Sequence, residues 1–150
     1  MFRGTNNSAF SGSRVPSDTI DAYLGTQYRI HGDTPFVLRI GQRSEELATL
    51  FQERDVSSAA VLTAWNPYSE FKTKAENEVE QGNLISALDR LALPHHPGHG
   101  ADPTGEWPPE PSQLVLGVDL EVAIDLGNQF RQNGIVWIGT DVIPTLILLC

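Results

Sequence analysis

Cysteine is nearly absent from this sequence, in which Cys150 is the only one among 150 residues. Disulfide bonds within the chain and a cysteine-based zinc site are therefore excluded. A chain of this length can still bury a core, because folding removes roughly 70% of its unfolded surface from water. The lack of disulfides is typical of proteins in the reducing cytosol, so we expect a cytoplasmic protein.

Basic residues are also few. The chain has 10 lysines and arginines against 19 aspartates and glutamates, which gives a net charge of −9. Such a surface repels a phosphate backbone, so we expect no nucleic-acid partner. The acidic surface either keeps the protein soluble or docks on a basic protein partner.

Long apolar runs are missing as well. The longest, residues 142–150, is far shorter than the ~20 helical residues that span a bilayer, and residues 1–18 lack the apolar stretch of a signal peptide. We therefore expect no membrane partner. The motifs G-x-S-x-G, G-x-x-x-x-G-K and G-x-G-x-x-G are absent too. A serine hydrolase of the common type, a P-loop NTPase and a dinucleotide-dependent oxidoreductase are therefore unsupported.

What the sequence does contain is an alternation of helix and strand patterns behind a polar N-terminal segment. Residues 1–18 are rich in serine, glycine and asparagine, which predicts a flexible arm ahead of one globular domain over residues 19–150. Helices are predicted over residues 19–27, 45–53, 74–91 and 120–133. Strands are predicted over residues 36–40, 57–63, 113–118, 135–138 and 145–149.

This order predicts an α/β or α+β fold, in which helices pack on a mixed five-stranded sheet. Residues 57–63 are an almost continuous run of small or apolar side chains, which indicates a central strand buried on both faces. We expect a ferredoxin-like arrangement for residues 57–149. Residues 94–111 are dense in proline and glycine and are predicted to form a long loop.

Capping signals mark most of the predicted helix ends. Asp18, Ser44 and Asp119 stand at predicted N-caps, and Thr73 with Glu76 has the spacing of a capping box. Asn133-Gly134 predicts the end of the last helix.

Several short motifs together resemble a known bacterial family. They are the run Thr63-Ala64-Trp65-Asn66-Pro67 with Ser69, the pair Glu76-Asn77, the pattern Trp107-x-x-Glu110-x-Ser112, the pattern Phe130-x-Gln132, and an aromatic start with Tyr23, Thr26 and Tyr28. In these motifs residues 20–149 resemble domain-of-unknown-function family 3293 (DUF3293). The resemblance implies no established activity.

The segment that follows the predicted central strand is the first candidate for a site. In α/β folds, ligands gather where strands end and helices begin. Thr63, Asn66 and Ser69 supply neutral hydrogen-bonding groups there, and Trp65 and Tyr68 supply stacking faces, a mixture that suits a polar ligand with a planar part such as a nucleotide. A purely structural turn is the alternative. Asn77, in a first helical turn, gains little structurally and is therefore a further candidate, whereas Glu76 is explained by the capping box.

A second wall is expected from residues that precede the third and fourth predicted strands. These candidates are Trp107, Glu110, Ser112 and Gln132. A glutamate beside an aromatic ring can have a raised pKa, so Glu110 is the candidate general acid or base. A solvated loop carboxylate is the alternative. We expect Asn66, Asn77 and Glu110 to meet in one cleft.

The histidines 95, 96 and 99, with Asp102 nearby, are grouped in the way that metal ligands often are. No regular element is predicted there to hold their spacing, and the family resemblance does not extend to them. We therefore assign no metal and no cofactor.

Two hypotheses from different classes account for these patterns. The first is a domain that binds a small polar, nucleotide-like molecule, with catalysis left open. The second is an acidic interaction module, such as an inhibitor, immunity or anti-defence factor, that docks on a basic partner. A cleft lined by the polar motifs would favour the first, and a single dense acidic face would favour the second.

Overall fold

A computed structural model describes residues 12–149. Most of the predicted N-terminal arm, residues 1–11, lies outside the described residues, and Ser17 and Asp18 already belong to the first helix. In chain order the elements are α1 (Ser17–Gly25), β1 (Gln27–Ile30), β2 (Phe36–Leu38), α2 (Glu45–Arg54), β3 (Ala59–Leu62), the 3-10 turn η2 (Pro67–Ser69), α3 (Lys74–Arg90), β4 (His95–Ala101), β5 (Glu110–Leu116), α4 (Leu120–Gln129), β6 (Gly134–Ile138) and β7 (Thr145–Leu148).

The strands form one curled sheet of seven in the order β2-β1-β4-β5-β3-β6-β7. Every pair is antiparallel, so the predicted mixed sheet of five strands is wrong in both number and direction. The combination of helices and sheet is as predicted. Within residues 57–149, β3-α3-β4-β5-α4-β6 follow one another with their strands in the spatial order β4-β5-β3-β6. The ferredoxin-like assignment, which uses this chain order of elements, stays a prediction.

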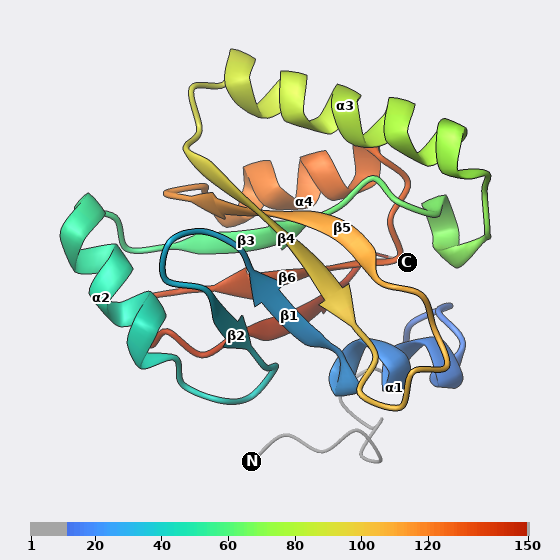
Figure 1. Cartoon of the computed structure of the whole chain (residues 1–150), viewed down its shortest axis with the longest axis horizontal. Coiled ribbons are helices and arrows are strands. Elements are labelled where there is room, and N and C mark those ends of the chain that lie inside the picture. Colours follow the sequence, from blue (N-terminus) through green and yellow to red (C-terminus); the bar gives the residue numbers. More distant parts are fainter. Residues whose placement is uncertain (1–11, 150) are drawn as a thin grey trace.

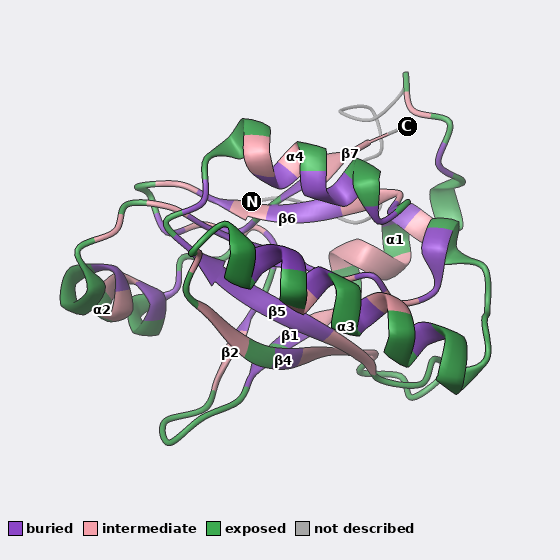
Figure 2. Cartoon of the chain, turned by 90° about the horizontal axis from the view of Figure 1, so that it is seen from above, coloured by how far each residue is buried: buried purple, intermediate pink, exposed green. Residues whose placement is uncertain are grey.

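Helices cover both faces of the sheet, as Figure 1 shows, with α3 and α4 above it and α1 and α2 below. Two apolar clusters follow from this layering. One joins Ile20 of α1 and Leu47 of α2 to the lower face, and the other joins Leu84 of α3 and Leu126 of α4 to the upper face. The four residues of β3 are buried on both faces, as predicted for the central strand. Figure 2 shows how the buried residues of α3 and α4 turn toward the strands beneath them.

The two strands that the sequence pattern missed are β1 and β4. Most of the predicted loop 94–111 is in fact strand, since β4 takes up residues 95–101 with the sequence HHPGHGA and β5 already begins at Glu110. Glycine is required at position 98, because a Cβ there would lie 2.4 Å from the carbonyl oxygen of Arg29 in β1. Positions where two backbones approach so closely must be glycine, so the strand lacks the alternation of side chains by which strands are normally recognised.

Local capping signals were more reliable than the strand pattern. Ser44 caps α2 by accepting from the backbone N–H of Leu47, and Thr73 and Glu76 make the reciprocal bonds of a capping box, so both predictions are confirmed. Asp18 lies inside α1, behind Pro16 as the N-cap, and Asp119 is an N-cap without a side-chain hydrogen bond.

The last helix ends earlier than predicted. The chain leaves α4 after Gln129 through Phe130 and the left-handed Arg131, so Asn133-Gly134 does not cap the helix, and Gly134 begins β6. None of the helices within residues 12–149 is long and apolar enough to cross a membrane.

Candidate functional site

A cavity of about 310 Å³ lies between the lower face of the sheet, helix α1 and the segment after β3. Its floor follows from strand register. Tyr28 of β1 pairs with Gly100 of β4, and Gly100 pairs in turn with Glu110 of β5. Directly paired residues share a face of the sheet, so this row carries the phenol of Tyr28, no side chain at Gly100, and the carboxylate of Glu110. Gly100 puts no side chain between Tyr28 and Glu110, and the Thr26 methyl group packs against it.

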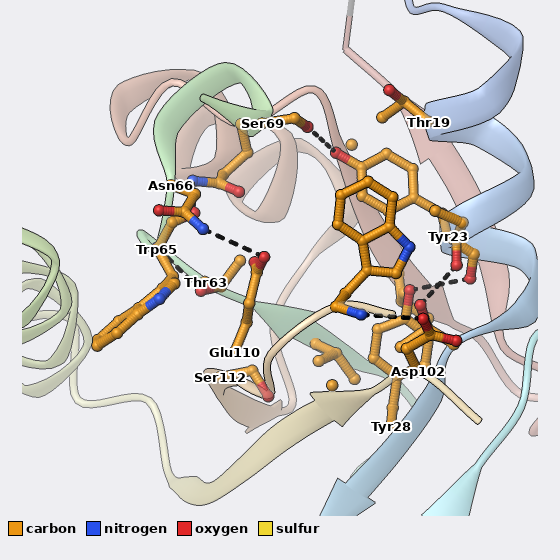
Figure 3. Close-up of a pocket in the computed structure, with 18 of the residues that line it drawn as sticks. Thr19, Tyr23, Tyr28, Thr63, Trp65, Asn66, Ser69, Asp102, Glu110 and Ser112 are labelled. Carbon is orange, nitrogen blue, oxygen red and sulfur yellow. Dashed lines mark hydrogen bonds between the residues drawn. The ribbon is translucent and has the colours of Figure 1, made fainter. Parts of the chain in front are cut away.

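The next row along the same strands repeats this arrangement. Ile30 pairs with Gly98, and Gly98 pairs with Ser112. Ser112 is 5% exposed and lines the cavity beside Glu110 (Figure 3). Its Oγ has no hydrogen-bond partner among the described residues. A buried hydroxyl is normally paired, so this atom is an unsatisfied polar group beneath the cavity floor.

Helix α1 forms the opposite wall. Thr19, Ala22 and Tyr23 line the cavity from successive turns, and Thr26 follows at the end of the helix. The Tyr28 hydroxyl donates to the carbonyl of Tyr23, which ties the floor to this wall. Burial raises the pKa of Tyr28 far above its ordinary range, so its hydroxyl stays protonated.

Residues 64–72, which we call the site loop, close one end of the cavity. Asn66, Tyr68 and Ser69 all have left-handed backbones, with φ of 46°, 54° and 61°. Side chains other than glycine rarely take this conformation, and it persists only where the surroundings enforce it. The enforcing contacts come from distant segments: the Tyr68 N–H donates to the carbonyl of Arg131, and the Ser69 hydroxyl accepts from Asn133 Nδ2.

Asn66 is the centre of the loop's hydrogen bonds. Its backbone N–H donates to Asn77 Oδ1 over 2.8 Å, and Asn77 Nδ2 donates back to Asn66 Oδ1 over 2.8 Å. Its own Nδ2 donates to Glu110 Oε2 over 3.3 Å. The structure therefore brings Asn66, Asn77 and Glu110 together as one chain of contacts. Asn77 stands behind the loop and does not line the cavity, so its role is to position Asn66.

Gln81 is a positioning residue that the sequence analysis missed. Its Oε1 accepts from the N–H of Ala64 over 2.9 Å and from the Thr63 hydroxyl over 3.3 Å. It lies one helical turn after Asn77 and is buried with it. Asn77 and Gln81 stand at i and i+4, on the same face of α3 as the buried Leu84 and Leu88, and two amides in line with an apolar stripe are the signal that could have identified this support.

The Glu110 carboxylate faces the cavity and can accept further hydrogen bonds. Within the described residues its only hydrogen bond is the one from Asn66. Burial raises the pKa of Glu110, and the Asn66 bond lowers it by less, so the net direction is upward. A negative charge on Glu110 is therefore energetically unfavourable until a hydrogen-bond donor or a cation pairs with it.

Asp102 also lines the cavity, but its hydrogen bonds hold the loop in which it lies. Its oxygens accept from the hydroxyl and N–H of Thr104 and from the N–H groups of Glu106 and Trp107. These bonds hold Trp107 at the mouth of the cavity. There its indole stacks on Phe71 of the site loop, with ring centroids 6.2 Å apart and 24° between the planes. Both rings are largely exposed, at 49% and 66%.

The predicted site residues thus separate into three groups. Those that line the cavity are Thr63, Trp65, Asn66, Ser69, Trp107, Glu110, Ser112 and Gln132. Asn77 lies behind the cavity. The Trp65 indole points away from Glu110 in Figure 3, so it is not the stacking face that the sequence indicated. That face is built instead from Tyr23, Tyr28, Phe71 and Trp107.

The histidines lie outside this cavity. His95 contacts Gln113 Oε1 and Asp89 Oδ1, each over 2.9 Å, and His99 contacts His31 over 2.6 Å. Across residues 12–149, no group of three or more histidine, cysteine, aspartate or glutamate side chains is arranged to hold a metal ion.

The raised pKa of Glu110 predicts how stability depends on pH. The folded protein holds the Glu110 proton more tightly than the unfolded chain does, so this residue contributes stability below 4.5, its ordinary pKa, and that stability is lost as the pH rises through the folded value. We expect Glu110→Gln to have a higher unfolding free energy than the wild type at pH 7 to 8, and the difference to vanish in acid. Urea denaturation across a pH series measures this.

The matched control is Glu78→Gln, which removes the same charge from an exposed position on α3. Its difference from the wild type should show no comparable dependence on pH. A Glu110→Gln difference that is equally flat would contradict the buried-carboxylate assignment.

Fold and site together define a helix-covered antiparallel sheet with an aromatic-walled cavity at the end of its central strand. Residues 62–135 match the model of the family described as "Protein of unknown function (DUF3293)", which confirms the predicted resemblance for this segment. The matched segment contains every predicted site residue, while Tyr23 and Tyr28 precede it. Comparison with curated proteins and with solved structures finds no match.

Proposed function

We propose that the protein binds a small molecule with a planar part in this cavity. The observation that carries the proposal is the Glu110 carboxylate, which lines the cavity and keeps one oxygen without a hydrogen bond from the described residues. A bound molecule with an N–H or O–H group can donate to that oxygen. The aromatic walls and a volume near the lower end of the range for ligand pockets, about 300–1,000 Å³, support a small, ring-bearing ligand.

Glu110 gives the same site a group suited to proton transfer. A carboxyl whose pKa is raised by burial and which keeps a free oxygen is typical of general acids and bases. We assign that role to Glu110 for any reaction that takes place in the cavity.

The test is a fragment screen by NMR on the full chain, with amide shifts read at Gly100, Ser112 and the site loop. We expect planar fragments to shift these amides, and Glu110→Gln to weaken the binding of fragments that carry N–H donors. Glu78→Gln, at an exposed position on α3, is the matched control and should leave fragment binding unchanged. If no fragment reaches the cavity, the proposal is wrong.

The acidic interaction module is the competing proposal. The feature that distinguishes the two is a cleft lined by the polar motifs, and the cavity has this feature. A basic partner would instead bind acidic side chains outside it. Binding of such a partner that survives Glu110→Gln unchanged would favour the module.

A further inference from the structure

The charge of the cavity lining restricts what can enter. Asp18, Asp102 and Glu110 contribute acidic groups, and the described lining residues include no lysine, arginine or histidine. A phosphate or carboxylate placed there would lose its water without gaining a counter-charge, which is unfavourable in a partly buried site. The lining therefore selects against anions, including the phosphates of a nucleotide.

The hydrogen-bonding groups of the floor show which edge a ligand must present. Glu110 has one oxygen that accepts from Asn66 and another that has no bond from the described residues. Ser112 Oγ lies beside it and is unpaired, but it is fully covered, so Glu110 supplies the contact with a ligand. A carboxylate accepts on both of its oxygens and therefore matches an edge with two adjacent N–H donors.

The aromatic rings of the cavity favour the same chemistry. Tyr28 lies across the Gly100 gap from Glu110, and Trp107 and Phe71 stack at the mouth. Aromatic faces attract both planar rings and cations. A flat ring that carries a positive or neutral nitrogen edge is thus held by the walls and the floor together.

We propose that the cavity takes a small, neutral or cationic nitrogen heterocycle with an amidine-type N–H edge toward Glu110, and that it rejects phosphorylated and carboxylated ligands. This inference rests on the proposed function and narrows it. A nucleobase or nucleoside fits the class, and a nucleotide does not.

The experiment compares ligands that share a ring and differ in the charge of one group. Benzamidine, benzamide and benzoate are titrated into the full chain and followed by NMR, and adenosine is compared with adenosine 5′-monophosphate in the same way. We expect benzamidine to shift the amides of Gly100 and Ser112, benzoate to leave them unmoved, and the monophosphate to bind no better than the nucleoside. Glu110→Gln should weaken benzamidine binding about tenfold or more, the usual effect of losing a charge-assisted bond, and Glu78→Gln should not.

The outcomes distinguish an error in the ligand class from a failure of the proposed binding function. If benzoate or the monophosphate binds in the cavity as tightly as its uncharged or cationic counterpart, the ligand class is wrong and the cavity still binds planar molecules. If Glu110→Gln leaves benzamidine binding unchanged, the assigned edge is wrong. If none of these compounds or the screened fragments shifts the cavity amides, the binding function itself fails.

Discussion

Replacing Leu62 by alanine should lower the unfolding free energy by about 2–5 kcal/mol, the usual cost of deleting a buried leucine side chain. Leu62 is 2% exposed and lies on the central strand β3, in the apolar cluster beneath α3 and α4. Its neighbours there come from two helices and three strands, so the space cannot easily collapse. Urea denaturation of the variant and the wild type measures the loss.

The stability loss in Leu62→Ala should be compared with that of a substitution in the site loop, which follows β3 in the chain. Asn66→Ala removes bonds to Asn77 and Glu110 but opens no apolar cavity, so we expect it to cost less stability than Leu62→Ala and to weaken ligand binding instead. Val79→Ala, at a position 63% exposed on α3, controls for apolar truncation and should be nearly neutral. If Asn66→Ala proves as costly as Leu62→Ala, then Asn66 acts mainly as a structural turn.

Asn77→Ala is expected to have the second-largest effect, a loss of about 1–3 kcal/mol in unfolding free energy. Asn77 is 2% exposed, and its amide makes the two reciprocal bonds that hold Asn66. Without it the buried N–H of Asn66 has no acceptor, and the left-handed backbone of the site loop loses its main support. The amides of residues 64–72 should therefore exchange faster with solvent, as measured by hydrogen exchange.

Asn83→Ala is the matched control, since it makes the same change at an exposed position of the same helix. Both variants gain the higher helix propensity of alanine, so the difference between them isolates the buried bonds. Equal effects in the two variants would show that Asn77 contributes nothing beyond helix propensity.

Local signals in the sequence determined the elements whose causes are also local. Thr73 and Glu76 form their capping box within four residues, and the apolar run of β3 is buried on both faces wherever its partners lie. The family resemblance of residues 62–135 was likewise found from short motifs taken together. The meeting of Asn66, Asn77 and Glu110 could be predicted because the end of β3 must lie beside the start of an antiparallel neighbour.

Only the tertiary structure decided what depends on register between distant segments. Gly98 and Gly100 look like loop residues in sequence, yet each occupies the middle of a cross-strand row. Gly98 admits the Arg29 carbonyl of β1, and Gly100 lies on the cavity floor. The inward side chains of Tyr28 and Ser112 follow from the same rows, and the outward direction of the Trp65 indole follows from the contacts that hold the site loop. Residue type and spacing thus specify helices, caps and buried strands through interactions between near neighbours in the chain. The cavity is defined instead by the side chains that surround it, and these come from segments as far apart as α1 and β5.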